Sequence, residues 1–140
     1  MLDFNKYFNE QYQFTLKNVS FSWVKNDSTE TNFEIKISDS INTEIQNRHL
    51  EVVFKRKVYF VPEALFNLSV SFAFTLTFRD SICEEEMNSV NWSEAFTQSE
   101  SPYLANIISR TSGLISSITS SFGQQPLVTP PNIIVKESDF

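Results

Sequence analysis

The segment from Phe66 to Phe78 alternates between apolar and small polar residues at nearly every position. Alternation with a period of two predicts a β-strand that buries one face. One phase is apolar and mostly large, and we expect it to face a core: Leu68, Val70, Phe72, Phe74, Leu76 and Phe78. The other phase is small and rich in hydroxyl groups, and we expect it to face solvent: Asn67, Ser69, Ser71, Ala73, Thr75 and Thr77.

Three further segments show a similar alternation. Residues 12–24 form a first strand whose apolar phase moves from even to odd positions after Leu16, which predicts a β-bulge. A shorter strand follows over 32–37, and a polar, loop-like segment follows over 38–48. A third strand runs from Leu50 to Val61 and ends at Pro62, because proline cannot donate to a ladder. It forms a predicted hairpin with the strand that begins at Phe66.

Between residues 102 and 122 the apolar spacing changes to that of a helix. Apolar residues recur at every third or fourth position and form one stripe, while serine and threonine cover much of the remaining surface. Ser101 is the expected N-cap, Pro102 the first helical residue and Gly123 the expected C-cap. Serine is a weak helix former, which leaves two explanations open: close packing on a second side of the helix, or an unconstrained exposed face.

Strands followed by one long helix predict an α+β fold, in which a four-stranded antiparallel sheet carries the helix on one face. At 140 residues the chain is long enough for one domain with a core. We expect a single domain over 1–140, with strands over about 12–79, an acidic connection over 80–100, a helix over about 102–122 and an extended segment over 123–140. We then expect the apolar side chains of the Phe66–Phe78 strand to pack beneath the helix.

The composition excludes several kinds of site. Two glycines cannot build a glycine-rich phosphate loop, and the single Cys83 and single His49 are too few for a Cys/His metal site or an intrachain disulfide. We therefore expect no metal, no cofactor and no catalytic residue. The net charge of −6 argues against nucleic acid, and the chain has no apolar run of about 20 residues that could insert into a membrane. The first residues show no secretory signal, so we expect a cytoplasmic protein.

Acidic residues concentrate between Asp80 and Ser109, a stretch with six acids and no lysine or arginine. Three of these acids are consecutive and are candidates for docking a basic partner through long-range attraction: Glu84, Glu85 and Glu86. The alternative, and the more common role of such a charge run, is a solvated connection.

The sequence from Ser101 onwards resembles the SecB family of export chaperones. In that family a helix that begins with Pro-Tyr is followed by a glycine, a Pro-Leu step and a Pro-x-Asn-apolar ending. The segment from Asn18 to Trp23 resembles the family's first strand, and the order of elements agrees over about 12–135. The matching positions of the motif are Pro102, Tyr103, Gly123, Pro126, Leu127, Pro130, Asn132 and Ile133.

The resemblance implies a cytoplasmic, ATP-independent holdase that binds unfolded polypeptides and assembles as a homo-oligomer, either a dimer or a dimer of dimers. Two departures leave export through the translocase motor SecA open. The family's acidic SecA-docking position falls near Asn67, which is uncharged, and the chain ends soon after Asn132, so we expect the family's second helix to be absent.

A holdase needs adaptable apolar surface and no catalytic residue. Aromatic residues outside the regular inward phases are our candidate client contacts: Trp23, Tyr59, Phe66, Trp92 and Phe96. Trp92 and Phe96 are four residues apart and could form a short amphipathic lid. Each of the five could equally be an ordinary core or loop aromatic.

Two alternatives to a general holdase remain open. One is a dedicated module on the same scaffold that serves a single partner, such as the antitoxin of a toxin–antitoxin module or the partner of a phage-encoded adaptor. The other is an enzyme or small-ligand carrier, which is least favoured because His49 stands alone at a strand entry and the acids beside Cys83 disfavour a thiolate. Suppressing the aggregation of unrelated proteins would separate the general holdase from the dedicated module.

Overall fold

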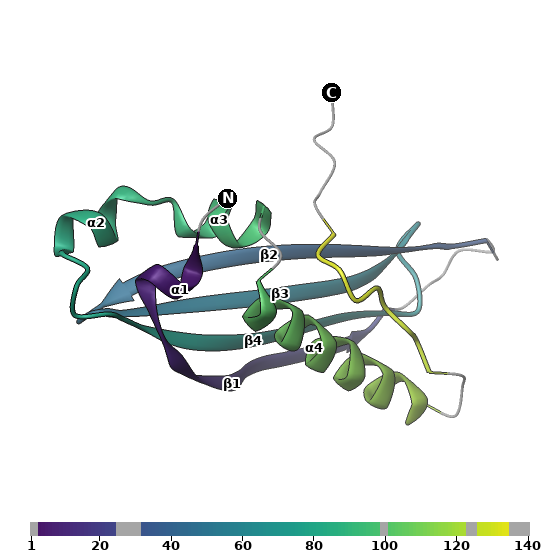
Figure 1. Ribbon diagram of the computed structural model, residues 1–140. Helices are drawn as coiled ribbons and strands as arrows, with labels where there is room; N and C mark the ends of the chain where they lie inside the picture. Colours follow the sequence, from purple (N-terminus) through teal and green to yellow (C-terminus); the bar gives the residue numbers. More distant parts are fainter. Residues whose placement is uncertain (1–2, 25–31, 99–100, 123–125, 135–140) are drawn as a thin grey trace.

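The computed structural model describes residues 3–24, 32–98, 101–122 and 126–134, with Glu10 and Gln11 as backbone only. The predicted C-cap Gly123 lies outside these residues. In the described part, four strands form one antiparallel sheet in the order β1-β4-β3-β2 (Figure 1). The strands are β1 (Phe8–Trp23), β2 (Glu34–Gln46), β3 (His49–Val61) and β4 (Phe66–Phe78). The hairpin predicted between β3 and β4 is confirmed.

The helices are α1 (Phe4–Tyr7), α2 (Glu84–Ser89), α3 (Trp92–Gln98) and α4 (Pro102–Ser120). Both α3 and α4 lie on one face of the sheet, because Phe96 of α3 and Tyr103 of α4 contact the same residue, Phe74 of β4. No helix in the described ranges is long and apolar enough to cross a membrane. The predicted α+β fold, with a helix packed on one face of an antiparallel sheet, is confirmed.

The apolar phase of β4 is the centre of the core, as the alternation predicts. Its side chains are at most 9% exposed from Phe66 to Phe78. Leu50, Val52, Phe54 and Val58 of β3 lie beside them, and α4 covers them with Leu104, Ile107, Ile108 and Ile115. Burial of this many large side chains is the main contribution to stability.

The opposite face of β4 is mostly half-buried, although the pattern predicts solvent exposure. Ser71 and Ala73 are only 8% and 2% exposed. Ser71 stands in register with Lys55 of β3 and Asn18 of β1. Because β4 is an inner strand, its small side chains lie between longer neighbours and are shielded by them. Figure 1 shows the helices on the other side of the sheet.

The second strand is much longer than expected. β2 continues to Gln46, through the segment predicted as a polar loop over 38–48. The alternation does continue there through Ile41 and Ile45, but Asp39 interrupts the apolar phase. A two-residue turn then joins β2 to β3 at Asn47 and Arg48, whose φ angles are 48° and 63°, as tight hairpins of matching twist require.

The described part of the acidic connection, residues 80–98, contains two helices, α2 and α3. The three acids of Glu84–Glu86 lie in the first turn of α2, where negative charge favours helix formation. The bulge predicted after Leu16 is confirmed by a register shift between Leu16 and Asn18. The Ser101 N-cap is also confirmed, since its Oγ accepts a hydrogen bond from Tyr103 N at 3.2 Å.

Candidate functional site

Four apolar side chains form an exposed row along β1, which we call the β1 stripe. Their exposed fractions are 39% for Phe14, 47% for Leu16, 39% for Val19 and 66% for Trp23. Each pairs directly with a core residue of β4, for example Leu16 with Phe72. Directly paired residues point to the same side of a sheet, so the stripe continues the hydrophobic core outward to the sheet edge.

The stripe stays open because α4 packs mainly over β4 and β3. The helix reaches β1 through Tyr103, whose ring centre lies 4.8 Å from that of Tyr12, and through two polar side chains. Asn106 Nδ2 donates to the Tyr12 hydroxyl at 2.8 Å. The Arg110 guanidinium lies 3.9 Å from the centre of the Phe14 ring, a cation–π contact. The helix therefore forms one wall of a shallow apolar strip whose floor is β1.

β1 is also an edge strand. Along its outer side, no strand in the described part of the chain pairs with its backbone N–H and C=O groups. An extended polypeptide can add to such an edge by main-chain hydrogen bonds, whatever its sequence. The strip thus combines a backbone edge with adjacent apolar side chains.

An aromatic cluster closes one end of the strip. Trp23 lies 4.9 Å from Phe21, 5.1 Å from Phe122 and 6.3 Å from Phe66, measured between ring centres. Phe66 is 9% exposed, whereas Trp23 is the most exposed aromatic residue of the four. Of the candidate client contacts, these two are brought together by the fold.

The other three aromatic candidates lie elsewhere. Tyr59 is half-buried on the opposite face of the sheet, where Lys57 Nζ lies 5.4 Å from its ring centre. Trp92 and Phe96 belong to α3, as the predicted lid requires, but they are 3% and 0% exposed. Trp92 packs against Tyr7, Phe8 and Phe78, and its Nε1 donates to Met87 O at 2.8 Å. These two side chains form core rather than surface.

The acidic candidates sit on α2. Glu84 and Glu85 are exposed and Glu86 is half-buried. Cys83 Sγ is 3.3 Å from Glu86 Oε1, and His49 Nδ1 is 3.1 Å from Thr77 Oγ1. Among the described residues no group of His, Cys, Asp and Glu could hold a metal ion.

A buried ion pair escaped the sequence analysis. Arg56 of β3 and Asp39 of β2 are directly paired, and both side chains are 0% exposed. Both occupy the inward phase of their strands, and a charged residue in that phase was the available signal. Residues 126–134, which we call the C-terminal strap, lie over this pair beside α4 (Figure 1). Strap contacts with Ser112 and Thr119 support close packing as the explanation for part of the serine- and threonine-rich side of α4.

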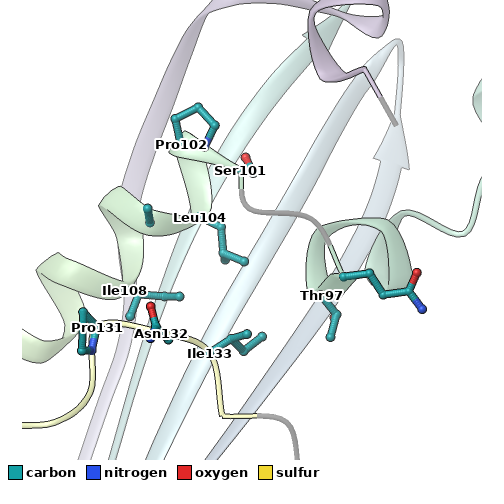
Figure 2. A pocket seen from close by; sticks show the side chains of 10 residues that line it. Thr97, Ser101, Pro102, Leu104, Ile108, Pro131, Asn132 and Ile133 are labelled. Carbon is teal, nitrogen blue, oxygen red and sulfur yellow. The ribbon is translucent and has the colours of Figure 1, made fainter. Parts of the chain in front are cut away.

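An open cavity of about 500 Å³ lies between the end of α3, the start of α4 and the strap. Figure 2 shows Thr97 of α3, Leu104 and Ile108 of α4, and Ile133 of the strap around it. Its lining also includes Pro102, Pro131 and Asn132. Three positions of the SecB-like motif therefore border this cavity: Pro102, Asn132 and Ile133. None of the described residues that line the cavity has an ionisable side chain.

No family model matches the sequence, and no curated protein matches it. Solved structures do match by fold. The Mycobacterium tuberculosis Rv1957 SecB-like chaperone, in complex with a ChAD peptide from the Rv1956 HigA1 antitoxin, superposes with a TM-score of 0.59 at 9% identity, over 86% of this chain and 88% of that chain. A protein of unknown function from Streptococcus agalactiae gives a TM-score of 0.44 at 12% identity, over 86% of this chain and 97% of that one. The first likeness shows a shared fold.

Proposed function

We propose that this chain is a SecB-like chaperone, a holdase that binds unfolded polypeptides. The observation that carries the proposal is the β1 stripe, four apolar side chains exposed along an edge strand of a SecB-like fold. Apolar side chains of a client would lie on the stripe, while its backbone adds to the β1 edge. Neither contact depends on a particular client sequence, which is what a holdase needs.

The similar fold of Rv1957 supports a polypeptide partner for this chain, since the Rv1957 structure contains a bound antitoxin peptide. The same observation favours the second candidate function, a module dedicated to one client. Under both functions the protein is not an enzyme, and its location is cytoplasmic. Export through SecA stays open, as Asn67 supplies no charge for docking, and Glu84–Glu86 are the candidates for a basic partner.

We also propose a homo-oligomer, a dimer or a dimer of dimers. An exposed stripe on an open edge strand favours self-association as well as client binding. The two uses would compete if both occupied the whole stripe, so part of the stripe must remain accessible in the assembly. The mass of the assembled protein tests this directly.

The first experiment is light scattering of two unrelated refolding clients, with and without the protein, with the mass measured in parallel. A general holdase suppresses the scattering of both clients near equimolar ratio. Suppression of neither client by a folded protein would contradict the general holdase. Capture of a single antitoxin-like partner under the same conditions would then support the dedicated module.

A further inference from the structure

The ion pair of Arg56 and Asp39 holds the strap mainly by its backbone. Arg56 Nη1 donates to Pro130 O at 2.7 Å, and Nη2 donates to Asn132 O at 3.0 Å. Asp39 Oδ2 accepts the backbone N–H of Ile134 at 2.7 Å. The only strap side chain that Arg56 contacts is Thr129, whose Oγ1 lies 3.0 Å from Nη1. Charge-assisted bonds of this length are strong.

These contacts fall on every second residue of the strap, across a bend at Pro131 and Asn132. The two carbonyls and the N–H belong to residues 130, 132 and 134, each two residues apart. The groove floored by Arg56 and Asp39 therefore holds the strap mainly through backbone atoms, with one side-chain contact at Thr129.

The strap's side chains are buried to different extents, and Thr129 is only 4% exposed. Leu127 and Ile133 pack against the core, but Val128 is 82% exposed. The cavity of about 500 Å³ beside Pro131 and Ile133 stays unfilled by the strap. A segment with a larger apolar side chain at that point would bury more apolar surface than the strap does.

We propose that this groove is a second client site, which residues 126–134 occupy in cis. Its ligand is an uncharged segment with a large apolar side chain beside α4, and it binds by displacing the strap. This inference rests on the proposed holdase function. Because the strap competes at high local concentration, the measured affinity of a client falls with the fraction of chains whose groove is open.

A disulfide that reversibly fixes the strap to α4 tests whether a client displaces the strap. Ser112 Oγ and Thr129 Oγ1 are 2.9 Å apart, close enough for a disulfide after Ser112→Cys and Thr129→Cys, with Cys83→Ser to remove the native thiol. We expect the oxidised protein to lose most of its suppression of client scattering and the reduced protein to regain it. Equal suppression by both forms would overturn the proposal while leaving the holdase function intact.

A second measurement does not depend on any client. A labelled synthetic peptide of residues 126–134 is titrated against full-length Leu127→Ser, which weakens the strap but spares Arg56 and Asp39. The control is full-length Val128→Ser, altered at the neighbouring exposed position. We expect the peptide to bind Leu127→Ser about tenfold more tightly than the control, and equal affinities would overturn the proposal. If the locked variant is inactive in both redox forms, this comparison decides alone.

Discussion

Arg56 and Asp39 face each other across β3 and β2, joined by bonds of 2.8 Å from Nε to Oδ1 and 2.7 Å from Nη2 to Oδ2, with both side chains 0% exposed. Two parallel bonds in this geometry make a bidentate pair. The remaining N–H groups of Arg56 are directed at α4 and the strap. One guanidinium thus connects the sheet, the long helix and the C-terminal segment.

Removing one member of this pair should destabilise the protein strongly. Arg56→Met leaves the Asp39 carboxylate buried without its partner, and we expect a loss of about 3–5 kcal/mol in the free energy of unfolding. Adding Asp39→Leu should recover part of that loss, because no unpaired buried charge remains. Urea unfolding of both variants measures the difference. A loss below about 1 kcal/mol for Arg56→Met would show that the pair is hydrated.

The β1 stripe can be tested with two neighbouring positions that point to opposite faces. Leu16→Asp places a charge within the stripe, and we expect suppression of client scattering to fall severalfold. Thr15→Asp, exposed on the other face, should leave suppression unchanged. The mass of each variant shows whether assembly has changed as well. Equal suppression of client scattering by the two variants would show that the β1 stripe is not part of the client site.

The two tryptophans should behave in opposite ways. Trp92→Ala empties a core position that is 3% exposed, and we expect a loss of about 3–5 kcal/mol in unfolding free energy. Trp23→Ala, at 66% exposed, should cost about 1 kcal/mol or less and weaken client binding instead. Thermal unfolding and client light scattering, run on both variants, separate the two effects. A stable Trp92→Ala protein would contradict the packing of α3.

The start of α4 depends on its N-cap. Ser101→Ala removes the side-chain acceptor for Tyr103 N, and we expect a loss of about 1 kcal/mol in unfolding free energy. Ser109→Ala, at an exposed position within the same helix, is the matched control and should be neutral or slightly stabilising. The two variants are compared by their denaturant midpoints. If the slope of unfolding free energy against denaturant concentration is unchanged, the shift in midpoint measures the difference in stability.

Much of the fold could be predicted because one signal, alternation, reports burial directly. Alternation placed β3, β4 and the bulge of β1, and an apolar spacing of three to four residues placed the helix that covers them. Alternation failed over 38–48, where Asp39 breaks the apolar phase and its partner Arg56 lies 17 residues further on. A buried charge is explained only by its partner, and pairing across strands cannot be read from either segment alone.

The candidate site was less predictable for a related reason. An aromatic residue such as Trp92 and one such as Trp23 give the same sequence signal, and only the packing of α3 and the edge position of β1 distinguish them. The strap contacts were also hidden, because most of them involve main-chain atoms. Pro130 and Asn132 belong to the SecB-like motif, but the motif does not show that their carbonyl oxygens accept hydrogen bonds from Arg56.

The face of the sheet that carries no helix affects how soluble the protein remains once a client is bound. A client on β1 or in the strap groove would occupy the side that bears the helices. The exposed Lys55 and Lys57 on the opposite side would stay hydrated. Electrostatic repulsion between protein–client complexes would then come from the face of the sheet that binds no client. The onset of precipitation should therefore depend on the charge of that side as much as on the affinity of the client.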